Sequence, residues 1–120
     1  MTVAKRVVDT LNSAGIDGLG KAYSYYIPAS SLNTETKALI AVSEVTQLPV
    51  EYGSNTYSQI EKNIQVKICY PNNSQVDAED LEKSVASILM QKKWRRQPDN
   101  GHYLDEQGRL ETDLYFKGEN

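Results

Sequence analysis

The sequence predicts an α+β domain, in which a mostly antiparallel sheet of about four to five strands is flanked by two helices. Two segments, residues 2–14 and 77–92, carry apolar residues at helical spacing. Three others, near residues 37–45, 60–70 and 109–117, have the apolar alternation or the apolar clustering of strands. The resulting order of helix, strands, helix and strands is typical of this fold class.

The first predicted element is an amphipathic helix over residues 2–14. Thr2 is a suitable N-cap, and Gly15 is well placed to end the helix. A short edge strand is predicted for residues 23–28, because Pro28 has no N–H to donate to a ladder, and a loop for residues 29–36. The apolar stripe of the helix consists of Val3, Val7, Leu11 and Ala14.

Two strands are predicted in the middle of the chain. Residues 37–45 are apolar on both faces, which indicates a central strand covered on both sides, by helices or by a neighbouring subunit. The polar segment 47–58 then leads to a strand over residues 60–70. One face of that strand has Ile64, Val66, Ile68 and Tyr70, and the other has Gln65, Lys67 and Cys69.

The C-terminal part begins with a helix over residues 77–92. Asp77 is its predicted N-cap, and Asp80 completes an arrangement like a capping box. Its predicted buried stripe is Leu81, Val85, Ile88 and Leu89. Residues 102–104 are expected to pair back after a turn, and the last strand, residues 109–117, alternates between two sets of side chains. These sets are Leu110, Leu114 and Phe116 on one face, and Glu111, Asp113 and Tyr115 on the other.

Composition indicates one globular domain spanning residues 1–120. Hydrophobic residues make up 39% and charged residues 24% of the chain, and its net charge of −3 argues against a polycation that neutralises phosphates. The single cysteine excludes an internal disulfide. There is no apolar run of the roughly 18 residues that a membrane span needs, and no signal-peptide core, so a cytoplasmic location is expected.

Catalytic and metal-binding patterns are weak. Cys69 lies inside a predicted strand, where packing is its expected role, and nothing in the sequence indicates that it pairs with the only histidine, His102. A zinc site would have to use carboxylates, and the glycines of residues 15–20 lack the spacing of a phosphate loop. The sequence therefore predicts no catalytic residue, no cofactor and no metal ion, and the chain is not expected to be an enzyme.

Three acidic residues allow more than one interpretation. Glu111 and Asp113 share one face of a strand, where two close acids could serve a glycosidase or a cation site. The alternative is an outer sheet face on which they meet Lys67 or another lysine. Glu44 ends an apolar strand, and either a cross-strand partner such as Lys67 or an ion pair at a subunit interface could satisfy it.

The basic run "KKWRR", residues 92–96, resembles a nucleic-acid patch with an aromatic inside it. The preceding helix offers a simpler explanation, because it begins with acidic residues and ends with Lys92 and Lys93. Acids near the N-terminus and bases near the C-terminus of a helix stabilise its dipole. In this interpretation, Trp94 folds back onto the core.

Six stretches resemble, in order and spacing, the tail-terminator class of small siphophage proteins from phages of Gram-positive bacteria. They cover nearly the whole chain, although no single one is as specific as a metal-ligand spacing; Tyr57 departs from the phenylalanine that the family pattern leads us to expect. The stretches are "YIP" (26–28), "TKALIAVSEV" (36–45), "YGSNTYSQ" (52–59), "IQVKICY" (64–70), "KKW" (92–94) and "LYFKG" (114–118).

The resemblance implies a sheet flanked by helices and a ring, a hexamer, at the end of the tail tube of a virion assembled in the host cytoplasm. The ring would stop polymerisation of the major tail tube protein, offer a surface to the head-completion or connector protein, and let DNA pass without specific binding. No membrane partner is implied. The expected interface residues are Tyr52, Gly53, Asn55, Tyr57 and Glu44, and the expected lumen residues are Glu111 and Asp113.

Three other functions stay open at this stage. A head–tail connector, or neck component, is a second role within virion assembly. A nucleic-acid-binding accessory module would use "KKWRR", and a small hydrolase would use Glu111 and Asp113.

Overall fold

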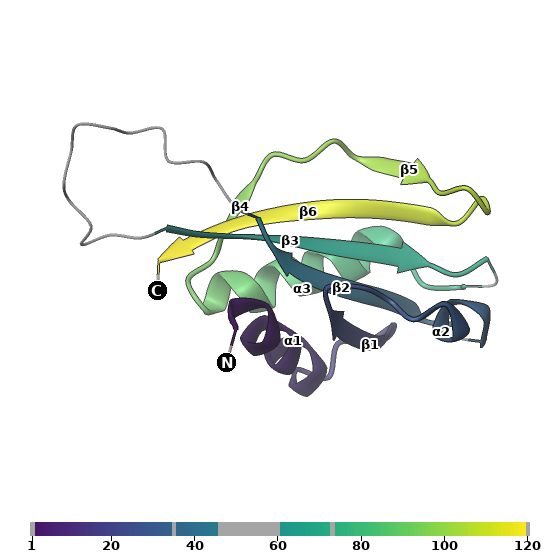
Figure 1. The fold of residues 1–120 in the computed structure, drawn as a ribbon, viewed down its shortest axis with the longest axis horizontal. Helices are drawn as coiled ribbons and strands as arrows, with labels where there is room; N and C mark the ends of the chain where they lie inside the picture. The colour runs from purple at the N-terminus through teal and green to yellow at the C-terminus, as the bar shows by residue number, and fades with distance from the viewer. Residues whose placement is uncertain (1, 35, 46–60, 73, 120) are drawn as a thin grey trace.

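Two helices cover one face of a mixed, mostly antiparallel sheet in the computed structural model, which describes residues 2–34, 36–45, 61–72 and 74–119 (Figure 1). The predicted α+β class is confirmed, with six strands and three helices in place of four to five strands and two helices. The elements are α1 (Val3–Ser13), β1 (Leu19–Ser24), α2 (Ala29–Thr34), β2 (Ala38–Glu44), β3 (Glu61–Tyr70), α3 (Ala78–Gln91), β4 (Arg95–Gln97), β5 (His102–Leu104) and β6 (Leu110–Glu119).

The strands lie in the order β1-β2-β3-β6-β4, and β5 also pairs with β6. Only β1 and β2 are parallel among the pairs in the described residues. A parallel pair needs a crossover of about a dozen residues, usually with a helix, and α2 provides it. The prediction of a loop for residues 29–36 was therefore wrong. β4 and β5 pair with successive parts of the same edge of β6.

The edge strand β1 was predicted too late in the chain. It ends at Ser24, because Tyr25 has a φ of 73°, a left-handed conformation that does not continue a strand. The side chain of Asn12 in α1 accepts a hydrogen bond from the backbone N–H of Ala22 at 2.8 Å and donates to its C=O at 3.1 Å. Backbone groups of the edge strand are thus paired with α1.

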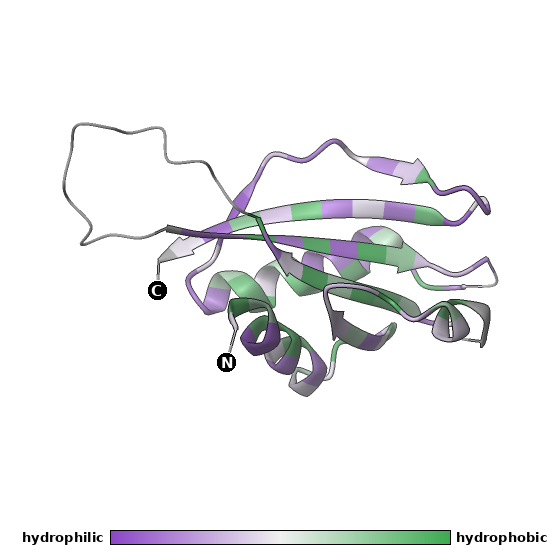
Figure 2. Ribbon diagram, viewed as in Figure 1, coloured by the Kyte–Doolittle hydropathy of each residue, from purple (hydrophilic) through white to green (hydrophobic). Residues whose placement is uncertain are grey.

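The core lies between the sheet and the helices α1 and α3. The predicted inward face of β3 is confirmed, and in register with it β6 places Phe116 opposite Ile64 and Leu114 opposite Val66. Figure 2 shows apolar residues concentrated along the strands and on the helices beside them. The predicted helix stripes differ at three positions, since Ala14 is exposed and Val3 and Ile88 are only partly buried. The helices contribute Ala4, Val7, Val8, Leu11, Leu81, Val85, Ala86 and Leu89.

Both predicted N-caps are confirmed. The Thr2 hydroxyl accepts a hydrogen bond from the Lys5 N–H at 3.1 Å, and the Asp77 carboxylate accepts one from the Asp80 N–H at 3.1 Å. Each cap pairs one of the N–H groups that a helix leaves without an intrahelical partner. No helix within the described ranges is both long enough and apolar enough to cross a membrane.

Candidate interaction surface on the outer face of the sheet

The face of the sheet opposite α1 and α3, here called the outer face, carries the polar side chains of β3 and β6. In register, Lys67 lies opposite Asp113, Cys69 opposite Glu111, and Gln65 opposite Tyr115. Because side chains alternate along a strand, these residues point away from the apolar core. The alternation predicted for both strands therefore separates core from outer face correctly.

A hollow of about 320 Å³ lies on this face. Its floor includes Ala41 of β2 and Lys67 of β3, and its wall is the segment between β1 and β2, including Tyr25 and Leu32. The hydroxyl groups of Tyr23 and Ser31 lie 2.9 Å apart in a hydrogen bond that ties β1 to α2. β2 was predicted to be covered on both sides, and Leu39 and Ala41, on the outer face, are indeed buried.

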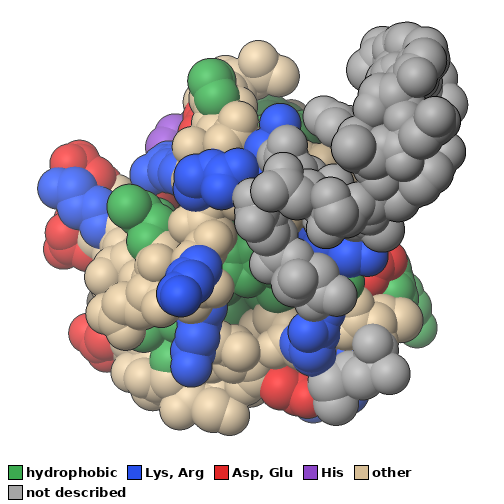
Figure 3. Space-filling model, turned by 90° about the vertical axis from the view of Figure 1, so that its left-hand side faces the viewer, with side chains coloured by type: hydrophobic (Ala, Val, Ile, Leu, Met, Phe, Trp, Pro, Cys, Tyr) green, Lys and Arg blue, Asp and Glu red, His purple; other side chains and the backbone are tan. Residues whose placement is uncertain are grey.

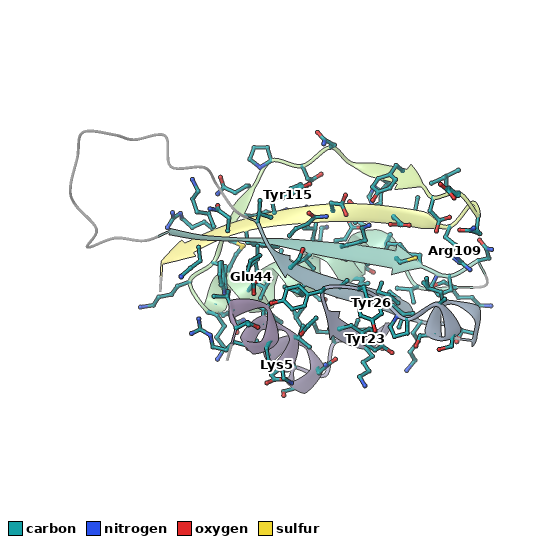
Figure 4. All side chains as sticks on the ribbon, viewed as in Figure 1. Lys5, Tyr23, Tyr26, Glu44, Arg109 and Tyr115 are labelled. Atoms are coloured by element: carbon teal, nitrogen blue, oxygen red, sulfur yellow. The ribbon has the colours of Figure 1, made fainter. Side chains whose placement is uncertain are left out.

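Exposed tyrosines surround this hollow and the strands beside it. The side chains of Tyr25, Tyr26 and Tyr103 are 50%, 71% and 41% exposed. Figure 4 shows Tyr23 and Tyr26 projecting from the region of β1 and α2. Aromatic side chains are enriched in protein–protein interfaces, where their large apolar surface is buried with little loss of conformational entropy. This outer face is therefore the candidate interaction surface in the described part of the chain.

Tyr103 of β5 joins the two predicted lumen carboxylates. Its hydroxyl donates to Glu111 Oε1 at 3.3 Å and to Asp113 Oδ2 at 3.1 Å. Glu111 also forms an ion pair with Lys67 at 3.7 Å, which confirms the predicted lysine contact on the outer face. Since the hydroxyl of Tyr103 lies between the two carboxylates, a glycosidic bond would have to displace it, and this argues against the hydrolase interpretation.

Glu111 is only 8% exposed, whereas Asp113 is half-buried. A channel wall that repels DNA needs exposed charge, so Asp113 fits the predicted lumen role better than Glu111. The Asp113 Oδ1 atom is buried and has no hydrogen-bond partner among the described residues. The lumen role of both residues stays a prediction.

The carboxyl groups of Glu111 and Asp105 are hydrogen-bonded to each other, and their pKa values shift in opposite directions. Burial raises the pKa of Glu111, although Lys67 opposes the shift. Burial also acts to raise the pKa of Asp105, but hydrogen bonds from the backbone N–H groups of Arg109 and Gln107, each 2.8 Å long, bring it below its ordinary value. Asp105 therefore keeps its charge, and Glu111 is the group that takes up a proton first as the pH falls.

Cys69 is buried beside this pair, and its predicted packing role agrees with the structure. Burial, followed by the charges of Glu111 and Asp105, raises the pKa of the thiol to about 11. The possible ligand atoms of Cys69, Asp105 and Glu111 lie within 4.8 Å of one another. A cation there would have to deprotonate a buried thiol and compete with the Lys67 and Arg109 charges, so the residues fit a metal ion poorly.

His102, the other residue considered for catalysis, lies in a different network. Its Nε2 atom is 2.6 Å from Glu82 Oε2 of α3, and the Tyr70 hydroxyl donates to the same oxygen at 2.9 Å. Glu82 is buried, and this network ties α3 to the sheet. No sequence pattern indicates this network, since the three residues lie in three separate elements.

Glu44 has a different partner from the one suggested by its sequence. Its carboxylate accepts a hydrogen bond from the Ala4 N–H in the first turn of α1 at 2.8 Å, and from the Tyr25 hydroxyl at 2.9 and 3.0 Å. In the observed register Glu44 lies opposite Ile64, and Lys67 lies opposite Ala41, so the cross-strand pair with Lys67 was wrong. Glu44 stabilises the N-terminus of α1. Its proposed place in an interface stays a prediction.

The basic run follows the end of α3. Trp94 packs against the core, as predicted, but α3 ends at Gln91 with no basic residue in its last turn; Lys92 is the C-cap and Lys93 comes next. Arg96 on β4 forms an ion pair with Asp99 at 3.3 Å. The other predicted interface residues, Tyr52, Gly53, Asn55 and Tyr57, lie outside the described residues.

The chain folds as a small α+β domain with exposed tyrosines on the outer face of its sheet. The chain belongs to the DUF806 family, proteins of unknown function, whose sequence profile matches residues 1–117. No match was found among curated proteins.

Proposed function

We propose that this protein is a phage tail terminator, which forms a ring on the end of the tail tube, stops tube polymerisation and provides the surface that the head joins. Its partners in this role are other copies of itself, six to a ring, the major tail tube protein and a head-completion protein. DNA passes through the ring without specific binding, and the protein is part of the virion. The α+β fold that the resemblance implies is the fold observed.

The observation that carries the proposal is the outer face of the sheet. The exposed Tyr25 and Tyr26 line a hollow there, and the exposed Tyr103 donates hydrogen bonds to the carboxylates of Glu111 and Asp113. Such a surface offers exposed aromatic side chains to a partner. Its carboxylates already have a hydrogen-bond donor, so they keep a polar contact when the partner excludes water. These are the properties of a docking surface, and they support an assembly role over a catalytic one.

The proposal is tested by interrupting this reading frame in the phage that carries it and imaging the particles by electron microscopy. We expect tail tubes of uncontrolled length that are not joined to heads. A wild-type copy supplied in trans should restore tails of uniform length. Tails of normal length, attached to filled heads, would contradict the proposal, and free tails of normal length beside filled heads would indicate a head–tail connector instead.

A further inference from the structure

The two ends of α3 carry hollows of opposite charge. At the C-terminal end lies a hollow of about 230 Å³, here called the basic hollow, whose lining includes Arg6, Lys62, Lys92, Lys93 and Trp94. Figure 3 faces this end and shows Lys and Arg side chains gathered around apolar ones. The chain as a whole has a net charge of −3, so this concentration of positive charge is local.

The apolar wall of the basic hollow is held rigidly. The Lys93 N–H donates to the Met90 carbonyl and the Trp94 N–H to the Leu89 carbonyl, each at 3.0 Å, which is the hydrogen-bond pattern of a Schellman motif. On the other side, a Cβ added to Gly118 would lie 2.8 Å from the Trp94 ring. The ring therefore lies directly against the backbone of β6, and only glycine permits this approach.

Lys93 occupies the position of this motif at which glycine is favoured. Its φ is 73°, a left-handed conformation that is strained for a residue with a side chain. Strained residues cluster at functional sites, which makes Lys93 a candidate for one. Within the described part of the chain, no ion pair involves Lys62, Lys92 or Lys93, and Lys92 and Lys93 are both exposed. Their charges are available to a partner.

A complementary surface lies at the other end of the same helix. A larger hollow, about 620 Å³ and here called the acidic hollow, is lined by Asp17, Asp77 and Asp80 together with the partly buried Val76 and the buried Leu81. Lys37 also lines it and reduces, without cancelling, its negative charge. Since α3 has 14 residues, the two hollows are separated by roughly 20 Å along the helix at 1.5 Å per residue.

We propose that the basic hollow of one copy binds the acidic hollow of the next copy. The inference rests on the proposed ring, for which it names the two contacting surfaces. Both hollows have apolar residues as well as charges in their linings, and the charges are opposite, so one copy offers what the other lacks. Two different surfaces in contact make a head-to-tail interface, which closes into a ring when the rotation between copies allows it.

Two charge-reversed variants test the contact. Lys92→Glu with Lys93→Glu cancels the positive charge of the basic hollow, because Arg6 and Lys62 remain, and Asp17→Lys with Asp80→Lys makes the acidic hollow basic. Asp77 is left unchanged because it caps α3. Self-association is measured by sedimentation velocity in about 50 mM NaCl, where screening is weak.

We expect wild type to associate, and the self-association constant of each variant to be at least about 100-fold lower, because the first variant loses the attraction and the second brings like charges together. An equimolar mixture of the two variants should recover association, since an acidic end then meets a basic end. Variants that associate as wild type does, a mixture that does not recover, or a wild-type chain that is monomeric at about 1 mM would each overturn the contact.

Lys93→Gly separates this role from a merely structural one. Glycine relieves the strained φ and should raise the thermal midpoint by about 3 °C, while loss of the charge should weaken association. Lys93→Arg is the matched control and should keep association. A Lys93→Gly variant that associates at the wild-type level would contradict the role of this side chain.

Failure of the contact and failure of the ring function are distinguishable. If the charge-reversed variants restore uniform tails in a phage that lacks the wild-type copy, the contact is wrong and the tail-terminator function stands. If the contact holds in solution but tails are normal without the protein, the function is wrong and the contact stands. A duplex DNA shift that is lost in Lys92→Glu with Lys93→Glu, while self-association is unchanged, would assign the basic hollow to nucleic acid instead.

Discussion

The two faces of the central strands β3 and β6 differ in the interactions that stabilise them. On the inner face, Ile64 and Phe116 contact each other and the helices through apolar surface alone. On the outer face, Glu111, Asp113 and Tyr103 are held by directional contacts that each require a particular partner. The inner face therefore depends on volume and hydrophobicity, and the outer face depends on the pairing of individual groups.

The largest effect is expected on the inner face. Phe116 is fully buried, so Phe116→Ala should lower the free energy of unfolding by about 3–5 kcal/mol, through lost burial and the cavity it leaves. Urea denaturation followed by circular dichroism measures this. The neighbouring Tyr115→Ala, on the opposite face of the same strand, is the control and should cost much less. Equal losses at both positions would contradict the division into two faces.

A slow thiol reaction is the next expected effect, on the outer face. The pKa of Cys69 is about 11 against an ordinary value of 9.0, so near pH 8 the native thiol should react with iodoacetamide roughly 100-fold more slowly than the unfolded one, because only the thiolate reacts. Mass spectrometry of timed samples, with and without urea, gives the two rates. Equal rates would show that the site opens readily.

A third prediction concerns the network that joins the sheet to α3. Tyr70→Phe removes the hydroxyl that donates to the buried Glu82 carboxylate, and it should cost about 1–3 kcal/mol of stability. Tyr23→Phe, which removes a half-buried hydroxyl bonded to Ser31, serves as a comparison and should cost less. A Tyr70→Phe variant as stable as wild type would mean that the contact with His102 is sufficient for the buried Glu82 carboxylate.

The pH dependence of stability should change in Glu111→Gln. The folded-state pKa of Glu111 is raised, so its contribution to stability is present below its unfolded pKa and is lost as the pH rises through the raised value. Glutamine does not titrate, so the stability of the variant does not change with pH at this position. The stability of Glu111→Gln relative to wild type should therefore increase from about pH 4 to about pH 7. Thermal unfolding across this range tests the sign, and a decrease would show that the Lys67 pair dominates.

The smallest expected effect on folding is at an exposed tyrosine of the outer face. Tyr26 is 71% exposed, so Tyr26→Ala should change the free energy of unfolding by no more than about 0.5 kcal/mol. If the outer face docks a partner, the same change should still impair tail assembly in the phage, because aromatic anchors often cost about 2 kcal/mol or more of binding. A folded variant that supports normal tails would remove Tyr26 from the docking surface.

Local patterns were sufficient to predict α1 and α3, the three main strands and the division of β3 and β6 into an apolar and a polar face. Each of these follows from the spacing of apolar residues within one segment, or from a cap such as Thr2 or Asp77 beside its own helix. The fold class followed from the order of these segments. The crossover helix α2 was missed because its pattern is short and polar, and only the parallel pairing of β1 with β2 requires it.

The contacts of the candidate surface were decided by the tertiary structure. Glu44 and Ala4 are 40 positions apart, and His102 and Glu82 are 20 apart. Such pairs depend on strand register and on how a helix sits on the sheet, and neither is encoded in the periodicity of a single segment. The same holds for the two hollows of α3: the sequence showed acids at one end of the helix and bases at the other, but only packing brought Arg6 and Lys62 beside Trp94, and Asp17 beside Asp80.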